Sequence, residues 1–288
     1  MTDQRVLLVK TDAQKKKASD RVVYLGPWCR GAHEGLEPPR MLPHHLDSLE
    51  SVDRLHELSS SLFETYSRQL VTILNHIHGV RWSDRAWQIL IGPWLTAFLD
   101  VVVDRFETIS QLRSQPFDLY TDATSYSYGT WAPLDTDEFV SLAACSDQFN
   151  EYLFSNLLVE SPETRNMVVG LSQDFRAPVV RNERPSNLRR VIWDAVGRAS
   201  ARLSRRLSSR VTFVDSYFHP FDQIILELKL GQIPLNLGRN IGVSSQPIDR
   251  AMRQSVDLRP HLADSLNAAI CRLLPELLPK PYLEGFKR

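Results

Sequence analysis

A long apolar segment in the first third of the chain constrains the fold most strongly. Between residues 83 and 112 the apolar side chains cover nearly every face of a helix, a pattern typical of a helix that is buried on all sides. Its most apolar part, residues 86–99, contains Gln88 and the pair Gly92-Pro93 and is shorter than the roughly 20 apolar residues of a membrane span. The segment therefore predicts the hydrophobic centre of a domain. Because proline lacks an amide hydrogen and clashes with the preceding turn, we expect a kink or break at Gly92-Pro93.

The segments around this helix favour an α/β fold, in which strands and helices form separate layers. We expect residues 1–20 to be a polar lead-in and residues 21–288 to form one α/β domain, with a helix-rich insertion at about 51–158. The β-branched and aromatic residues 21–25, ended by Gly26-Pro27, predict a buried strand. The other expected elements are a short strand at 5–9, a helix from Ser51 to Gly79, a strand and loop within 116–133, a helix at 136–158, an amphipathic helix at 187–209, a strand at 211–214 and a helix at 221–230.

Charge and cysteine content exclude several classes of protein. The chain has 34 Lys+Arg and 34 Asp+Glu, so it lacks the excess positive charge by which general nucleic-acid binders gain affinity. Its three cysteines are far apart in the sequence, which favours neither a zinc knuckle nor a disulfide framework and fits a reducing, cytoplasmic setting. The only apolar run near the N-terminus is too short for a signal peptide.

One segment is strongly basic. Residues 181–210 contain nine arginines against Glu183 and Asp194, a local charge of plus seven. Four of these arginines share one face of the amphipathic helix expected at 187–209, namely Arg198, Arg202, Arg205 and Arg206. Such a face can bind phosphate groups or an anionic membrane surface. A solvated face, or one paired with acidic residues elsewhere, is the default interpretation.

The loop that follows the strand at 21–25 is the best candidate for a functional site, because ligands of open α/β sheets bind at the carboxyl ends of strands. His44 and His45, followed by Asp47, form its densest cluster of titratable residues. Imidazole changes charge near neutral pH, and a carboxylate two residues away could orient the His45 ring or hold its proton. The alternative is a polar loop whose histidines cap or contact the end of a helix.

Two further residues have both a chemical and a structural interpretation. Cys29 could become a thiolate if Arg30 or His33 lay beside it, but a small, partly buried cysteine next to Trp28 is the better interpretation. Arg85 precedes the expected kink and could present its planar guanidinium to a carboxylate or phosphate. No phosphate-binding loop, dinucleotide-binding fingerprint, nucleophile elbow or HExxH motif is present in the sequence.

Several blocks of the sequence resemble a family of bacterial transferases of O-antigen and other surface-carbohydrate biosynthesis. The longest block runs from His78 to Leu95 and contains SDRAWQILIGPWL. The shorter blocks are LGPWC at 25–29, PHHLD at 43–47, DQFN at 147–150 and PYLEGF at 281–286. The resemblance therefore covers residues 22–288. Where the family reads His-Trp-Asp, this chain reads His45-Leu46-Asp47.

The resemblance implies a helix-rich, Rossmann-like half of a two-domain glycosyltransferase with the GT-B arrangement. Such an enzyme transfers a sugar from a nucleotide-activated donor to a sugar or lipid-linked glycan acceptor, and the resemblance implies no metal. Family members continue beyond the block at 281–286, so we expect this chain to be the acceptor-side half, with the donor-binding domain absent or separately encoded.

Two hypotheses follow from these observations. In the first, the chain is a transferase in which His45, helped by Asp47, acts as a base or an acceptor ligand. In the second, it is a non-catalytic binding or accessory module that pairs with a partner chain, which an exposed apolar face would favour. The residues predicted to bind substrate are Trp28, Arg30, His33, His44, Arg85, Asp147 and Asn150. We expect a cytoplasmic protein, in contact with the inner face of the membrane through the arginine face.

Overall fold

The computed structural model describes residues 6–11, 21–29, 42, 44–115, 118–173, 220–230 and 247–286. The chain divides into two units, one formed by Met1–Pro178 with Val243–Arg288 and the other by Val179–Gly242. In the second unit the structure describes helix α7 at Pro220–Lys229, which confirms the helix expected at 221–230. The arginine-rich helix and the strand predicted at 211–214 lie outside the described residues.

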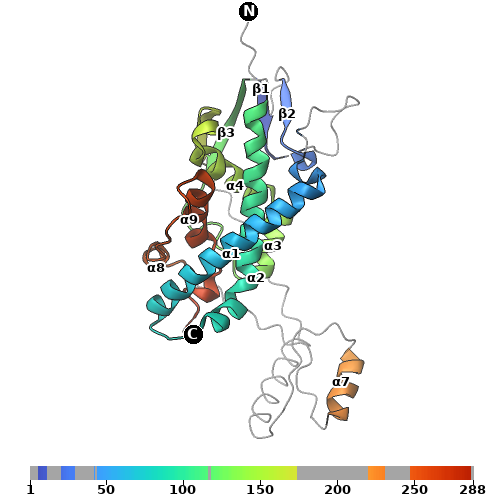
Figure 1. The fold of residues 1–288 in the computed structure, drawn as a ribbon, viewed down its shortest axis with the longest axis vertical. Helices are drawn as coiled ribbons and strands as arrows, with labels where there is room; N and C mark the ends of the chain where they lie inside the picture. The colour runs from blue at the N-terminus through green and yellow to red at the C-terminus, as the bar shows by residue number, and fades with distance from the viewer. Residues whose placement is uncertain are drawn as a thin grey trace, which may run out of the picture. The chain divides into compact units, whose positions relative to one another are not determined.

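A parallel sheet lies at one end of the first unit (Figure 1). Its described strands are β1 (Val6–Val9), β2 (Val22–Tyr24), β3 (Leu119–Ser125) and β4 (Val168–Gln173), in the order β2-β1-β3-β4. All four residues of β1 are buried, so part of the expected polar lead-in is a central strand. Because β2 and β3 pair with opposite edges of β1, the chain changes direction across the sheet between β1 and β3. The fold is thus a helix-rich α/β architecture with a parallel sheet.

Two long antiparallel helices follow β2, and they cross in Figure 1. Helix α1 (Leu49–His78) begins at Ser48, whose Oγ accepts the Ser51 N–H, and ends at Gly79. Gly79 has a φ of 63°, a left-handed conformation that glycine adopts without steric cost. The predicted helix is therefore confirmed, together with its glycine stop.

Helix α2 (Asp84–Ser110) forms the hydrophobic centre, as expected, but it runs through Pro93 without a break. Pro93 lies on an exposed position of the helix, and the Ile89 side chain is 70% exposed. The Ile89 carbonyl that loses its partner at Pro93 can therefore bind water, which makes the proline tolerable. The fully buried side chains of this helix include Trp87, Ile91, Trp94, Leu95, Phe98, Leu99 and Val102.

By length and composition α2 is apolar enough to cross a membrane, but half of that apolar window is buried inside the protein. It packs against α1, against the sheet-covering helix α4 (Asp147–Glu160) and against α9 (Ser265–Leu277). This is the packing of a core helix, as the sequence predicts.

The remaining elements differ from the prediction in two ways. A single helix was expected at 136–158, but α3 (Thr136–Cys145) and α4 are separate helices. Ser146 between them has extended backbone, and its Oγ accepts the Phe149 N–H, so it starts a new helix. Strand β4 and helix α9 were not predicted. The other short helices are η1 (Pro27–Cys29), η2 (His45–Asp47), η3 (Gln111–Ser114), α5 (Pro162–Arg165), α8 (Arg250–Gln254) and η4 (Lys280–Tyr282).

Glu276 of α9 is a partly buried carboxyl that holds the loop after β3, because one of its oxygens accepts the Gly129 N–H at 3.1 Å. Burial raises the pKa of Glu276, although the hydrogen bonds from Gly129 and Tyr152 act in the opposite direction. The folded protein therefore binds the proton more tightly than the unfolded chain, and this group's contribution to stability falls as the pH rises above the unfolded pKa.

We expect the variant Glu276→Gln to unfold at a higher temperature than the wild type at pH 7. The glutamine oxygen still accepts the Gly129 N–H, and the side chain carries no charge in this partly buried position. At pH 4, where the carboxyl is largely protonated in both states, the two proteins should unfold at nearly the same temperature. Thermal unfolding followed by circular dichroism at both pH values measures this. A variant that is less stable than the wild type at pH 7 would show that the ionised carboxylate stabilises the fold.

Candidate active site

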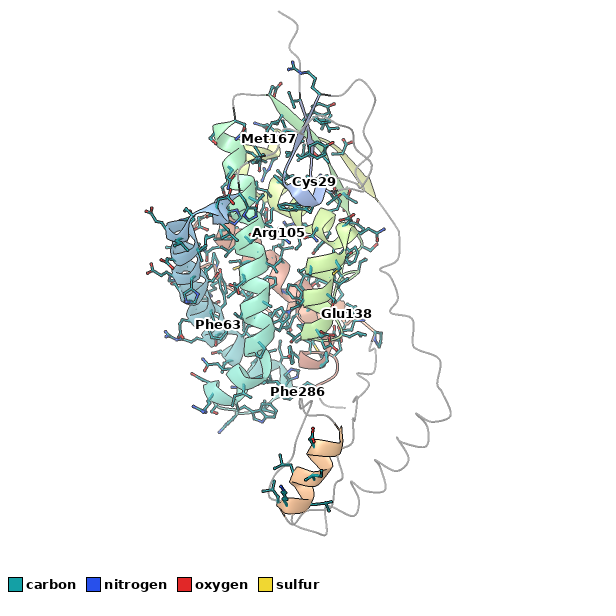
Figure 2. All side chains as sticks on the ribbon, turned by 90° about the vertical axis from the view of Figure 1, so that its right-hand side faces the viewer. Cys29, Phe63, Arg105, Glu138, Met167 and Phe286 are labelled. Carbon is teal, nitrogen blue, oxygen red and sulfur yellow. The ribbon has the colours of Figure 1, made fainter. Side chains whose placement is uncertain are left out.

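The carboxyl ends of β1 and β3, between which the strand order reverses, meet beside α4. The segment after β2 brings η1 next to one end of α2 at the same place. In open α/β sheets this is the place where ligands bind. The labelled side chains of Cys29 and Arg105 lie toward this end of the unit, and Phe286 lies at the opposite end of the helices (Figure 2). The groups that gather here come from the ends of strands, from η1 and η2 and from one end of α2.

Lys10, directly after β1, is the centre of a buried polar network. Its side chain is fully buried, its Nζ lies 3.0 Å from Glu151 Oε1 of α4, and it also donates to the backbone carbonyl of Asp122. The Glu151 carboxylate accepts further hydrogen bonds from the hydroxyls of Thr11, Thr124 and Ser155. This network ties β1, β3 and α4 together at the point where the strand order reverses.

The short helix η1 packs its side chains against the same strand end. Trp28 Nε1 donates to the Lys10 carbonyl at 3.2 Å, and Cys29 Sγ donates to the same oxygen at 2.9 Å. The Cys29 side chain is fully buried. A thiol whose hydrogen is held by a backbone carbonyl inside the core is not available as a thiolate nucleophile, so the packing interpretation of Cys29 is the one that the structure favours.

His44 and Asp47 cap the N-terminal end of η2. The Asp47 carboxylate accepts the His44 backbone N–H at 3.1 Å, and His44 Nδ1 accepts the Leu46 backbone N–H at 3.2 Å. This reciprocal arrangement is a capping box. The Asp47 carboxylate is therefore directed to the backbone of His44, whereas its predicted role was to hold the ring of His45.

Asp104, near the end of α2, is the carboxylate that pairs with His45. His45 Nε2 lies 3.0 Å from Asp104 Oδ1, and the His45 side chain is only 5% exposed. Burial by itself raises the pKa of the Asp104 carboxyl, but the hydrogen bond with His45 and the charge of Arg105 more than offset this effect and hold the pKa below its usual value. An ionised carboxylate next to imidazole orients the ring and stabilises its protonated form.

Arg105 fixes the other side of the Asp104 carboxylate. It donates to Asp104 Oδ2, and its Nε donates to Asn150 Oδ1 at 3.1 Å. The guanidinium carbon also lies 5.9 Å from the ring centre of Trp28 and 5.8 Å from that of Phe154, within the range of cation–π attraction. These hydrogen bonds and ring contacts fix the position of the guanidinium, and Arg105 therefore holds the Asp104 carboxylate in place.

Comparison with known families adds one finding. The family model described as LIC12162 family transferase matches residues 6–288. The chain belongs to this family. No match was found among curated proteins or among solved structures. The matched residues include every element that contributes to the site, from β1 to α4. The members of this family are described as transferases.

In this LIC12162 family transferase, several predicted site residues do come together. The His45 ring stacks on that of His44 at a centroid distance of 4.5 Å, and the edge of Trp28 meets His44 at 6.1 Å. Asn150 joins these residues because its Oδ1 accepts a hydrogen bond from Arg105. Its Nδ2 donates hydrogen bonds to the carbonyls of Ala143 and Ser146. We call the set Trp28, His44, His45, Asp104, Arg105 and Asn150 the imidazole cluster.

Three predicted residues that the structure describes do not belong to the imidazole cluster. The first is Asp47, whose carboxylate binds the His44 backbone N–H. Arg85 is exposed at the first turn of α2, nineteen positions before Asp104 on the same helix, or ~28 Å away at the rise of an α-helix. Its neighbour Trp87 stacks on Phe286 at 5.2 Å, at the far end of the unit. Asp147 is exposed at the first turn of α4. Arg30 and His33 lie outside the described residues.

Sequence reasoning missed Asp104, Arg105, Lys10 and Glu151. A charge near the end of an apolar helix looks like the end of the buried stripe, so Asp104 does not stand out in the sequence. The signal that was present is the adjacent pair Asp104-Arg105 directly after the buried residues Val102 and Val103. A charged pair in that position must face either solvent or a polar site.

Possible metal-ligand atoms of His44, His45 and Asp104 lie within 4.8 Å of one another. Histidine ligands use one nitrogen for the metal and donate a hydrogen bond through the other. His44 Nδ1 instead accepts a hydrogen bond from Leu46, so in the neutral ring Nε2 bears the hydrogen and neither nitrogen offers a lone pair to an ion. The donor set fits proton transfer and hydrogen bonding better than it fits a metal ion.

Proposed function

We propose that the protein transfers a sugar from a nucleotide-activated donor to an acceptor hydroxyl in bacterial O-antigen or other surface-carbohydrate biosynthesis. The family supports transfer chemistry, and the position of the imidazole cluster at the strand ends of a parallel sheet supports binding of an activated substrate there. The first unit then corresponds to the acceptor-side, Rossmann-like half of a GT-B arrangement. The observation that carries the proposal is the pairing of His45 with Asp104 at 3.0 Å.

In this mechanism His45 is the general base. Asp104 accepts the hydrogen of Nε2, which makes Nδ1 the basic nitrogen of the neutral ring. Nδ1 lies 3.4 Å from Thr108 Oγ1, a long contact, and the Thr108 hydroxyl gives its own hydrogen to the Asp104 carbonyl at 2.8 Å. In the proposed complex the acceptor hydroxyl approaches Nδ1 beside Thr108.

The reaction would proceed by attack of this hydroxyl oxygen on the anomeric carbon of the donor sugar. The new carbon–oxygen bond forms while the bond to the nucleotide phosphate breaks, and the hydroxyl proton passes to His45 Nδ1. Asp104 then stabilises the imidazolium ring, and Arg105 holds Asp104 in register. The leaving group is the nucleoside phosphate. Because the water-poor surroundings of His45 strengthen electrostatic interactions, the pair should be most effective when substrate covers it.

The test is release of nucleoside phosphate from a panel of nucleotide sugars, with and without candidate sugar or lipid-linked acceptors. We expect turnover with one donor class and a loss of 10²-fold or more, an effect of about the size of general base catalysis, in the variant His45→Ala. Arg68→Ala is the matched control, because Arg68 is an exposed residue of α1 that pairs only with Glu64 in the described structure. Equal turnover by the His45 variant and the wild type would contradict the base assignment.

The accessory-module hypothesis is favoured by one observation, an exposed apolar patch beside the imidazole cluster. It consists of Leu46, Leu49 and Val52, of which Leu49 is 84% exposed. Such a patch is suited to contact with another protein. If the chain binds nucleoside diphosphates but turns over no nucleotide sugar, and gains turnover only when a partner chain is added, the accessory function is correct.

Peripheral membrane contact through Arg198, Arg202, Arg205 and Arg206 is part of the same proposal, with the protein on the cytoplasmic side of the membrane. Enzymes that use lipid-linked acceptors must reach the membrane surface, and a cluster of arginines is attracted to anionic lipids. Flotation with anionic vesicles should recover the protein at low salt and release it at high salt. Absence of binding at low salt would contradict this part.

A further inference from the structure

We infer that His44 is a hydrogen-bond donor to an anionic phosphate oxygen of the nucleotide substrate, and that it donates through Nε2–H. The inference rests on the proposed function for the identity of the ligand. It goes further in dividing the two stacked imidazoles into two roles: His45 accepts a proton, and His44 donates a hydrogen bond.

The tautomer of His44 follows from its backbone contact. Nδ1 accepts the Leu46 N–H at 3.2 Å, and a nitrogen that accepts a hydrogen bond bears no hydrogen. The hydrogen of the neutral ring must then lie on Nε2. A ring in this state is a donor at Nε2 and cannot act as a base there. His45 has the same tautomer, because its Nε2 hydrogen faces the Asp104 carboxylate. The two rings differ at Nδ1, which in His44 accepts the Leu46 N–H and in His45 is the basic nitrogen beside Thr108.

The His44 ring is also held in orientation. Its own backbone N–H is bound by Asp47 at 3.1 Å, one ring face stacks on His45, and Trp28 meets it at an interplanar angle of 89°. The Asp47 carboxylate binds the His44 backbone N–H. The Asp104 carboxylate binds His45 and Arg105. Among the described residues no carboxylate occupies Nε2, and the half-buried His44 keeps contact with solvent.

The position of His44 suits the leaving group. In a displacement at the anomeric carbon the attacking oxygen approaches to ~3–3.5 Å, and the leaving oxygen is on the same carbon. The base that accepts the proton of the attacking oxygen and the donor that binds the leaving oxygen must therefore be neighbours. The ring centres of His45 and His44 are 4.5 Å apart. Negative charge develops on the leaving phosphate, where a prepositioned N–H donor lowers the barrier.

The first test is the tautomer itself, read from long-range ¹H–¹⁵N NMR correlations of the full-length protein labelled in its histidine rings. We expect His44 to carry its hydrogen on Nε2. Assignment of the hydrogen to Nδ1 would overturn the inference without any assay of activity.

The second test is binding of UDP and GDP as probes, measured by calorimetry for the wild type, His44→Asn and the control Arg68→Ala. Asparagine keeps the cap, because its side-chain oxygen can accept the Leu46 N–H, but its short amide does not reach the place of Nε2. We expect about a tenfold loss of affinity in His44→Asn, which corresponds to one hydrogen bond to a charged group.

The outcomes separate this inference from the proposed function. Unchanged affinity of His44→Asn, or no binding of either probe by the wild type, would overturn the donor role. Tight, His44-dependent binding without turnover of any nucleotide sugar would support the donor role and contradict glycosyl transfer by this chain alone.

Discussion

Asp104→Asn is expected to lower the turnover number by about 10³- to 10⁴-fold, the size of the loss when an amide replaces the carboxylate that orients a catalytic histidine. The amide removes the negative charge that stabilises the protonated ring. Its NH₂ group can also donate to Nε2, which moves the ring hydrogen to Nδ1 and blocks the basic nitrogen. The pairing of His45 Nε2 with Asp104 Oδ1 at 3.0 Å is the basis of this expectation.

The matched control is Asp47→Asn, in the same segment as His45. The Asp47 carboxylate serves as the acceptor of the His44 backbone N–H, and an asparagine oxygen accepts this bond equally well. We therefore expect turnover within about threefold of the wild type. Steady-state kinetics of both variants, after circular dichroism has shown that both are folded, measures the difference. A larger loss in Asp47→Asn than in Asp104→Asn would contradict the assignment.

The second large effect concerns stability. Lys10→Met is expected to lower the free energy of unfolding by about 3–5 kcal/mol, because it leaves a buried carboxylate without its cation. Lys10 is fully buried, and Glu151 is only 12% exposed. Three hydroxyls also donate to this carboxylate, but they bring no compensating positive charge. Urea unfolding followed by fluorescence, with the slope checked for a two-state transition, gives the value.

Two comparisons make this prediction specific. The double variant Lys10→Met with Glu151→Leu removes both charges and should recover part of the lost stability. Arg68→Ala breaks the exposed pair with Glu64, and it should cost less than about 1 kcal/mol. A loss below this value in Lys10→Met would show that the network at the end of β1 does not stabilise the fold.

Elements with a strong period or a clear stop could be predicted from the sequence. Strands β1 and β2 and helix α1 were predicted within a few residues, because apolar patterning and Gly79 mark them. Strand β4 was missed because Gly170 interrupts its apolar residues and the polar residues Ser172 and Gln173 end it, which weakens the strand signal. The structure explains this glycine: a Cβ atom there would lie 2.9 Å from Asp122 Oδ1 of β3. A local pattern carries no information about such a cross-strand contact.

The site was predicted in part for a similar reason. The histidines of the loop at 43–47 stand out in the sequence, and the structure places them with Trp28 and Asn150. The identity of the partner carboxylate could not be predicted, because Asp47 is close to His45 in the chain whereas Asp104 is close only in space. Arg85 and Asp104 share one helix, and only the packing of α2 determines which end of it meets the sheet.

A double-mutant cycle on the free energy of unfolding tests the pairing of His45 with Asp104 most directly, since it requires no substrate. Alanine variants of each residue alone and of both together give the coupling energy of the pair. We predict a coupling of about 1–3 kcal/mol for His45 with Asp104, as for a hydrogen bond to a charged group. The same cycle for His45 with Asp47 should give less than about 0.5 kcal/mol. A negligible coupling with Asp104, or a larger one with Asp47, would contradict the account.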